Sequence, residues 1–346
     1  MNIQKELSAI AENWTEPEYR QQPELSYSTL ATYERSGYNG LEHLFDKKES
    51  PSLLLGSIVD TCLTGGEDEF NSLYFVADFP ALGDKEQKVA NYLFNQFSGQ
   101  YDSFGNIPAT YILDAANVFE FQKNWKDDTR VKVLSERCYQ YYQLKYEAGS
   151  RTIVDAITFE DAKNMIRALR ESPATCGYFA DNDEMSPIRR YYQLKFKAYL
   201  DGVGYRCMAD LICVDYEKKK IYPIDLKTSS HTEWDFEESF LQWSYMIQSR
   251  LYWRIIKANL EKDPYFKDFT LEDYRFIVVN KITLTPLVWE FPLTKSLGTL
   301  VDDKGNEYRD PYVIGKELKA YLDCKPPVPN GINKDGINII TCLQKA

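Results

Sequence analysis

Histidine is scarce in this sequence of 346 residues, which contains only His43 and His231. Two histidines argue against histidine-based catalysis and against a histidine-rich metal site. Seven cysteines are present, but no two of them form a Cys-x-x-Cys pair, which argues against zinc or iron–sulfur binding. We therefore expect free thiols and no iron–sulfur cluster. Any bound metal would be a hard ion held by oxygen atoms.

Long apolar runs are also missing, since no stretch approaches the roughly 18 apolar residues that span a bilayer. The N-terminal stretch MNIQKELSAIAENW lacks the basic start and apolar centre of a secretion signal. We therefore expect a cytoplasmic protein without a membrane partner. The sequence contains no G-x-G-x-x-G and no G-x-x-x-x-G-K-[ST] stretch, which argues against helicases, ATPases and nucleotide-dependent α/β enzymes.

Basic residues are fewer than acidic ones, 41 against 52, which gives a formal net charge of −11. This total argues against indiscriminate nucleic-acid binding, although local patches and not totals contact phosphates. Residues 186–200 carry four basic residues and no acid, interleaved with tyrosine and phenylalanine: Arg189, Arg190, Lys195 and Lys197. The segment suits a phosphate track with stacking surfaces, and it equally suits an ordinary amphipathic strand with its basic side chains in water.

Apolar residues make up 44% of the chain and aromatic residues 14%, which indicates a packed globular protein. Turn-bounded extended runs predict strands over 189–202, 205–216 and 219–229, followed by a helix over 237–260 and one or two strands within 273–293. This order predicts an α/β fold with a mixed sheet flanked by helices. We interpret 1–346 as a single domain, with a core at about 26–66 and 187–325 and a mostly helical insertion at about 83–180.

An acid and an acid–lysine pair stand out on two neighbouring predicted strands. Asp210 lies in the middle of an apolar strand, where a carboxylate is costly to bury unless it is paired or binds a metal. Asp225 follows on the next strand of the hairpin, and Lys227 lies two residues later on the same face. Two carboxylates brought close across a hairpin repel unless a cation such as Mg²⁺ lies between them. Otherwise, Asp225 and Lys227 form a plain surface ion pair.

The pattern of strand, Asp, turn, strand and Asp-x-Lys resembles the PD-(D/E)xK nuclease superfamily. Gln248 and Tyr252, one turn apart on the next helix, resemble the Q-x-x-x-Y motif of its RecB-type branch. The run LLLGSIVD (53–60) resembles the G-x-x-x-H helix of that branch, with Asp60 in place of the histidine. The run SYSTLATY (26–33) resembles its S-x-S-x-L entry helix.

The resemblance spans roughly 26–60 and 187–290 and is greatest to the RecE-type and phage recombination exonucleases, the family of exodeoxyribonuclease VIII. It implies a restriction-endonuclease-like core and a deoxyribonuclease that uses Mg²⁺, or Mn²⁺ as a substitute. The implied metal ligands are Asp60, Asp210, Asp225 and the carbonyl oxygen of Leu226. The implied catalytic residues are Asp210, Asp225, Lys227, Gln248 and Tyr252, with Arg189, Arg190, Lys195 and Lys197 as DNA contacts.

By the same resemblance, the expected substrate is linear double-stranded DNA, degraded from 5′ to 3′ in phage-type recombination or repair. Expected partners are a single-strand annealing recombinase and further copies of the chain in a ring. Two alternatives stay open from the sequence. One is a structure-specific or restriction-type endonuclease on the same fold, and the other is a DNA-binding scaffold with an inactive nuclease core.

Overall fold

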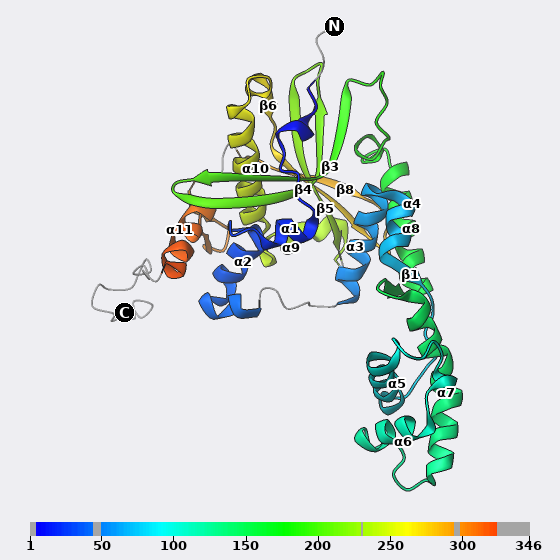
Figure 1. Cartoon of the computed structure of the whole chain (residues 1–346). Helices are drawn as coiled ribbons and strands as arrows, with labels where there is room; N and C mark the ends of the chain where they lie inside the picture. The colour runs from blue at the N-terminus through cyan, green and yellow to red at the C-terminus, as the bar shows by residue number, and fades with distance from the viewer. Residues whose placement is uncertain (1–4, 44–49, 230, 294–297, 324–346) are drawn as a thin grey trace, which may run out of the picture. The chain divides into compact units, whose positions relative to one another are not determined.

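The chain divides into two compact units in the computed structural model, which describes residues 5–43, 50–229, 231–293 and 298–323 (Figure 1). The first, here called the sheet unit, comprises Met1–Gly56 and Arg167–Ala346. The second, here called the helical unit, is Ser57–Ile166. The helical insertion predicted at about 83–180 overlaps the helical unit over 83–166.

A mixed β-sheet with the strand order β3-β4-β5-β7-β8 forms the centre of the sheet unit. Strands β3, β4 and β5 are antiparallel neighbours, β5 and β7 are parallel, and β7 and β8 are antiparallel. The short strand β6 also pairs with β5. The predicted mixed α/β fold is therefore confirmed. The strands are β3 (Ile188–Leu200), β4 (Val203–Asp215), β5 (Lys220–Ser229), β6 (Thr270–Leu271), β7 (Tyr274–Asn280) and β8 (Leu287–Phe291).

Tight turns join the first three strands, as the sequence predicts. Asp201 and Gly202 connect β3 to β4 with positive φ angles of 53° and 81°. Two consecutive positive φ angles are what a primed two-residue hairpin turn requires, and Asp-Gly is a preferred pair for it. The parallel pairing of β5 with β7 instead needs a crossover, which the intervening helices supply. β5 therefore belongs both to the antiparallel hairpin with β4 and to the parallel pair with β7.

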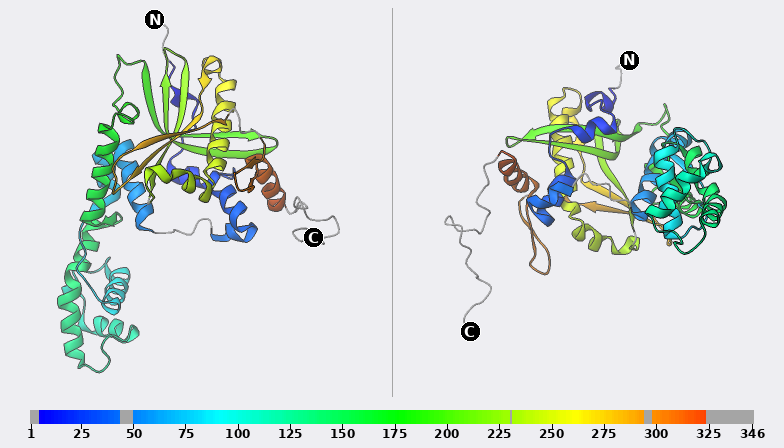
Figure 2. Two further views of the ribbon diagram at one scale, coloured as in Figure 1. Left: turned by 180° about the vertical axis from the view of Figure 1, so that it is seen from behind. Right: turned by 60° about the horizontal axis from the view of Figure 1, so that its bottom comes forward.

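Helices of the sheet unit pack on this sheet and on one another (Figure 2). Helix α10 contacts β3 and β4, and α2 contacts both α10 and α11. The α-helices are α1 (Glu16–Gln21), α2 (Tyr27–Ser36), α9 (Phe236–Gln242), α10 (Tyr245–Lys262) and α11 (Pro311–Leu322). Short 3-10 helices are η1 (Leu7–Ile10), η2 (Tyr38–His43), η4 (Cys176–Tyr178), η5 (Glu233–Asp235) and η6 (Phe266–Asp268), and β9 (Leu300–Val301) pairs with β10 (Glu307–Tyr308).

Local sequence sets the ends of these helices. The Ser26 side chain accepts a hydrogen bond from the Thr29 N–H and caps α2, and Gly37 ends that helix with a φ of 67°. The single helix predicted over 237–260 is wrong. It is two helices, because Ser244 adopts a left-handed conformation with φ 56° and ψ 41° between α9 and α10. No glycine or proline marks this break in the sequence.

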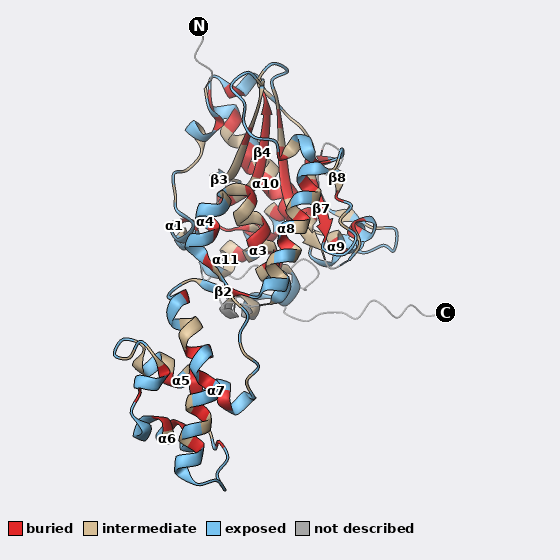
Figure 3. Ribbon diagram, turned by 90° about the vertical axis from the view of Figure 1, so that its right-hand side faces the viewer, coloured by how far each residue is buried: buried red, intermediate tan, exposed pale blue. Residues whose placement is uncertain are grey.

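The core of the sheet unit lies between the sheet and its helices. Buried residues run along β4, β7 and α10 (Figure 3), with Ile212, Val278 and Ile255 fully buried. Each buried side chain of this size stabilises the fold by about 1.5–3 kcal/mol relative to leaving it exposed. This core fixes the strands and α10 as a rigid frame.

The helical unit has a separate apolar core, in which Leu93, Leu134 and Tyr142 are fully buried. The Tyr142 hydroxyl donates a hydrogen bond of 2.7 Å to the Tyr101 carbonyl. The elements are α4 (Gly66–Leu73), β1 (Tyr74–Val76), α5 (Asp84–Phe97), η3 (Phe104–Asn106), α6 (Ala109–Val118), α7 (Asp127–Ala148) and β2 (Thr152–Val154). Strands β1 and β2 pair in parallel. Helices α3 (Pro51–Thr64) and α8 (Ala156–Glu171) each run from one unit into the other.

Five of the seven cysteines lie in the described part of the chain, and none of these five forms a disulfide: Cys62, Cys138, Cys176, Cys207 and Cys213. Burial raises the pKa of Cys213 to about 12. The other two, Cys324 and Cys342, lie outside the described residues. Across the described ranges, every helix is too short or too polar to cross a membrane.

Gly315 in α11 provides a direct test of the packing between α11 and β4. A Cβ atom at this position would lie 2.1 Å from the hydroxyl oxygen of Tyr205, whose ring is fully buried. We expect Gly315→Ala to lower the free energy of unfolding by about 1–2 kcal/mol, because the overpacking cost exceeds the gain in helix propensity. Urea unfolding measures this difference. Gly177→Ala is the control, since an added Cβ there meets no atom within 4 Å. An unchanged or raised stability of Gly315→Ala would show that the two elements do not pack as described.

Candidate active site

The two predicted acids meet where β4 and β5 separate. Their backbone pairing ends at Leu211 and Ile224, so Asp210 and Asp225 are the next residues on the two strands. The Asp210 carboxylate reaches across and accepts a hydrogen bond of 3.0 Å from the Leu226 N–H. The Asp210 side chain thus takes the place of a backbone carbonyl of β4 as the partner of the Leu226 N–H. The local separation of the strands makes room for carboxylates between them.

Asp225 is held in a three-residue arrangement with Lys227 and Gln248. Its carboxyl group is only 1% exposed, and its Oδ2 lies 2.7 Å from Nζ of Lys227. Gln248, which reaches the site from α10, donates a hydrogen bond of 2.5 Å from Nε2 to the other oxygen of Asp225. The Gln248 Oε1 accepts a hydrogen bond of 3.2 Å from Lys227. The amide therefore fixes both charged groups at once.

Lys227 is protonated at neutral pH in this setting. Burial would lower the pKa of Lys227, but the carboxylate of Asp225, with help from Tyr245, Asp210 and Tyr27, raises it above its ordinary value. The ammonium also lies 4.3 Å from the ring centroid of Tyr245, in a cation–π contact. Lys227 is therefore a fixed positive charge and hydrogen-bond donor rather than a base.

A cavity of about 240 Å³ opens beside this arrangement. All five residues predicted to be catalytic line it: Asp210, Asp225, Lys227, Gln248 and Tyr252. Tyr252 is largely buried, and burial raises the pKa of its hydroxyl well above the ordinary value, so the phenol stays neutral. The cavity thus brings together, from β4, β5 and α10, the residues that the resemblance implies to be catalytic.

Another part of the cavity lining comes from residues that the sequence reasoning did not assign. Ser26, Ser28 and Thr29 line it from the start of α2, and Arg20 and Arg206 also contribute. The run SYSTLATY marked this helix by resemblance, but only the folded chain places its first turn beside the carboxylates. Hydroxyls and a helix N-terminus suit an anion such as a phosphate, whereas Arg20 is ion-paired with Glu16 and Arg206 donates to backbone carbonyls.

Gln193 is a further residue to which the sequence assigned no role. The pairs Tyr192 with Leu211 and Leu194 with Ala209 flank it, so the register places Gln193 opposite Asp210. Its φ of 53° is left-handed, although it lies inside a strand and is not glycine. Such a backbone conformation costs about 1–3 kcal/mol and is found mainly at functional sites. This left-handed backbone conformation leaves no signal in the sequence.

The residues beside the cavity fit a hard divalent cation. The buried Asp225 Oδ2 accepts no hydrogen bond from the described residues, although Lys227 pairs with it electrostatically. With Asp210 and the Leu226 carbonyl, it offers an all-oxygen set of donors. In the described ranges, no group of three or more His, Cys, Asp or Glu side chains is placed to hold a metal. A bound ion would therefore complete its shell with backbone oxygen or water.

The predicted fourth ligand, Asp60, lies on α3 in the helical unit, so its role as a ligand stays a prediction. The glycine one turn earlier, Gly56, belongs to the sheet unit and has a clear structural purpose. A Cβ atom there would lie 2.9 Å from the Thr228 hydroxyl oxygen, next to Lys227 on β5. Glycine at this position therefore lets α3 approach β5 closely.

The four predicted DNA contacts lie on β3, outside the residues that line the 240 Å³ cavity. Arg189 donates to the backbone carbonyls of Asp183, Glu184 and Ser186. The buried Arg190 donates two hydrogen bonds to the Gly177 carbonyl. Lys195 contacts the Gln193 carbonyl at 3.4 Å. Lys197 lies 3.6 Å from the Glu12 carboxylate and 4.9 Å from the Trp14 ring centroid. Their contact with DNA stays a prediction.

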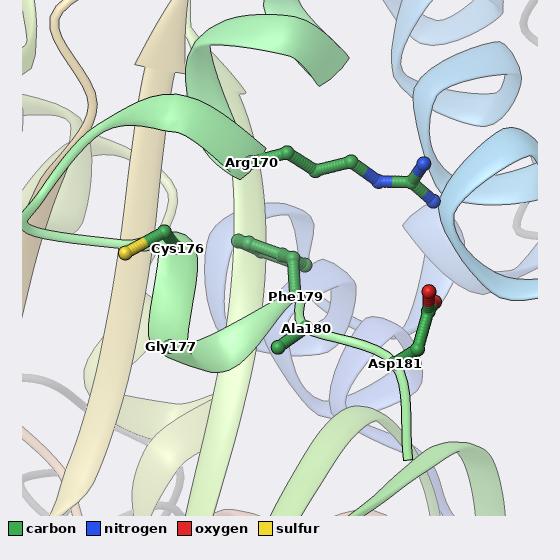
Figure 4. A pocket seen from close by; sticks show the side chains of 6 residues that line it. All are labelled: Arg170, Cys176, Gly177, Phe179, Ala180 and Asp181. Atoms are coloured by element: carbon green, nitrogen blue, oxygen red, sulfur yellow. The ribbon is translucent and has the colours of Figure 1, made fainter. Parts of the chain in front are cut away.

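A larger hollow of about 410 Å³ in the sheet unit contains none of the predicted residues. Arg170, Cys176, Gly177, Phe179, Ala180 and Asp181 line it, and Figure 4 shows the Arg170 and Asp181 side chains extending away from the Cys176 thiol. It has no carboxylate pair and no lysine. Its lining therefore offers fewer groups for catalysis or metal binding than the lining of the smaller cavity.

Comparison with solved structures finds proteins of similar structure. No protein-family model matches the chain, and no curated protein matches it. A solved structure from Eubacterium rectale, described as a "Putative exonuclease", is similar to this chain with a TM-score of 0.45 and 14% sequence identity. The similarity covers 91% of this chain and 87% of that chain.

Divalent metal should stabilise the sheet unit through Asp210 and Asp225. At a Mg²⁺ or Mn²⁺ concentration of one hundred times Kd, binding to the folded state adds about 2.7 kcal/mol. We expect the unfolding temperature of the wild type to rise with metal relative to EDTA, and Asp210→Asn and Asp225→Asn to lose that rise. Asp268→Asn, at an exposed acid of η6, is the control and should keep it. An equal rise in all four proteins would place the metal elsewhere.

Proposed function

We propose that the protein is a metal-dependent deoxyribonuclease that hydrolyses phosphodiester bonds, acting as a 5′-to-3′ exonuclease on linear double-stranded DNA. The observation that carries the proposal is the meeting of Asp210, Asp225 and Lys227 in one cavity, with Gln248 bridging two of them. Paired carboxylates beside a fixed ammonium suit hydrolysis at a phosphate, where negative charge must be neutralised.

Asp210, Asp225 and the Leu226 carbonyl would hold Mg²⁺, or Mn²⁺ in its place. The ion, when bound, supplies positive charge that neutralises the phosphate under attack. The separation of β4 from β5 gives these oxygens a common side on which to meet a cation. The burial of Asp225 and the hydrogen bond from Gln248 keep one carboxylate in a fixed orientation.

Lys227 would donate a hydrogen bond to the attacking water or to a phosphate oxygen. The Asp225 carboxylate raises the pKa of Lys227, so the lysine is protonated at neutral pH in this arrangement and acts as a proton donor rather than an acceptor. Its position is determined by three contacts, with Asp225, Gln248 and the Tyr245 ring. Three contacts restrict the ammonium to a narrow range of positions, which favours the transition state over alternative geometries.

The hydroxyl-rich part of the cavity lining supports a phosphate-bearing substrate. Ser26, Ser28 and Thr29 lie at the N-terminus of α2, where N–H groups and the helix dipole favour an anion. A DNA backbone has phosphates on both sides of the bond to be cut. One of these phosphates would bind at the N-terminus of α2, while the phosphate to be cleaved would lie beside the carboxylates.

DNA as the polymer, the 5′-to-3′ direction and the setting in phage-type recombination or repair rest on the resemblance to the RecE-type exonucleases. The same resemblance supports a homo-oligomeric ring around the DNA and a single-strand annealing recombinase as a partner. With a net charge of −11, contacts with DNA would have to be local. Arg189, Arg190, Lys195 and Lys197 are retained as candidates for them.

End-labelled DNA tests this proposal directly. Linear duplex labelled at either the 5′ or the 3′ end, and a circular duplex, are incubated with Mg²⁺ or EDTA. We expect only the linear DNA to be degraded, only with Mg²⁺, and with early release of the 5′ label. Lys227→Ala should lower the rate by about 10²–10³, the usual cost of removing one preorganised donor. Lys220→Ala, on the same strand but ion-paired to Glu272 away from the cavity, should retain full activity.

Each departure from these results has a definite meaning. Cleavage of the circle would identify an endonuclease. Early release of the 3′ label would reverse the direction. Binding of DNA without cleavage by the wild type would identify a scaffold. Equal activity of Lys227→Ala and Lys220→Ala would remove the lysine from the mechanism.

The bridging amide gives a second test. Gln248→Leu removes the hydrogen bonds to Asp225 and Lys227 while keeping a side chain of similar size. We expect it to lower kcat by about 10- to 100-fold and to raise the Mg²⁺ concentration at half-maximal rate, because residues that orient a metal ligand have effects of this size. Gln143→Leu, on α7 of the helical unit, is the control. A rise in KM for DNA with unchanged kcat would show that Gln248 binds DNA instead of positioning the charged pair.

A further inference from the structure

Trp243 is an exposed indole at an unusual break in the chain. It caps the C-terminus of α9, and Ser244 follows it in a left-handed conformation before α10 begins at Tyr245. Trp243 is 46% exposed, whereas Met246 and Ile247 just beyond the break are buried. A left-handed serine costs about 1–3 kcal/mol and persists where the surrounding structure imposes it. The break therefore holds a large aromatic side chain partly in solvent.

The backbone of Trp243 is tied to the wall of the candidate active site. Its carbonyl accepts a hydrogen bond of 2.6 Å from the hydroxyl of Tyr27, a residue that lines the 240 Å³ cavity. Two residues later, the Tyr245 ring supports the Lys227 ammonium. Trp243 thus lies within one hydrogen bond of the cavity lining and two residues from the contact that positions Lys227.

A cation from another element lies beside the indole. The guanidinium carbon of Arg35, in the last turn of α2, is 5.9 Å from the ring centroid of Trp243. Both groups are planar, and both stack on nucleobases, while the guanidinium also attracts phosphates. The first residue of the same helix, Tyr27, donates to the Trp243 carbonyl and lines the cavity, so α2 connects the Arg35–Trp243 pair with the cavity lining.

We propose that Trp243 and Arg35 form a stacking site for an unpaired nucleobase next to the cavity. The inference rests on the proposed function, since it requires a nucleic-acid substrate. An enzyme that cuts one strand at a duplex end must separate that strand from its complement before the phosphate reaches the carboxylates. A base stacked on Trp243 would stabilise the separated end. Stacking tolerates any sequence, because every base has a π face.

A fluorescent base tests the site. The full-length protein is mixed with a linear duplex that carries 2-aminopurine in an unpaired terminal position, with Ca²⁺ in place of Mg²⁺ to limit cleavage. We expect the wild type to quench the 2-aminopurine and Trp243→Ala to lose the quenching. The Kd of Trp243→Ala for this frayed duplex should rise about five- to 150-fold, the range for losing one base–aromatic stack. Trp243→Phe, which keeps a ring, should recover part of the affinity, and Arg35→Ala should also weaken binding.

Trp125 provides a matched control, because it is exposed to a similar degree, 43%, and belongs to the helical unit. Trp125→Ala should quench and bind as the wild type does. The inference is overturned if Trp243→Ala and the wild type give equal quenching and affinity, or if Trp125→Ala loses as much as Trp243→Ala. If Trp243→Ala does not fold by circular dichroism, Arg35→Ala and Trp243→Phe decide in the same assay.

Failure of this inference is distinguishable from failure of the proposed function. If the wild type degrades linear DNA with Mg²⁺ but Trp243 variants match it in quenching and affinity, only the stacking site is wrong. If the wild type neither degrades DNA nor binds the labelled duplex, the proposed function fails and the stacking site fails with it.

Discussion

The buried carboxylate of Asp225 is the constraint on which the rest of the site depends. A carboxylate that is only 1% exposed must be compensated, and here the compensation comes from Lys227 on the same strand and Gln248 on α10. Removing one partner of such a buried pair typically costs about 3–5 kcal/mol, because the other charge is left uncompensated. The same contacts that make the burial tolerable also fix both charged groups in position. Stability and chemistry are therefore coupled at this point of the fold.

The sheet provides the geometry that this coupling needs. β5 pairs with β4 in antiparallel on one side and with β7 in parallel on the other. It is therefore a central strand, held in position by a neighbour on each side. The separation of β4 from β5 beyond Leu211 leaves the Leu226 N–H to be bonded by the Asp210 side chain. The crossover through α10 returns the chain to β7 and brings Gln248 to Asp225 on the way. Gly56 allows α3 to approach the same strand at Thr228.

The sequence predicted the parts of this site that follow from periodicity. Side chains alternate along a strand, so Asp225 and Lys227 had to share a face, and a short turn had to bring Asp210 opposite them. Three features could not be predicted. The left-handed backbones of Gln193 and Ser244 are imposed by tertiary packing and leave no mark in residue type. The first turn of α2 joins the cavity only through long-range packing. Arg190 is as basic as its neighbours in sequence, and only the fold shows that it is buried on the Gly177 carbonyl.

Single-turnover cleavage of linear duplex DNA by the wild type and Asp225→Asn, across a range of Mg²⁺ concentrations, tests the central claim most directly. This substitution keeps the shape of the side chain and removes the charge that would face the cation. The account predicts that the wild-type rate saturates with Mg²⁺ and that Asp225→Asn is at least about 10²-fold slower at every concentration, as expected when a charge-stabilising group of the site is lost. Equal rates for the two proteins, or wild-type cleavage that persists in EDTA, would contradict it.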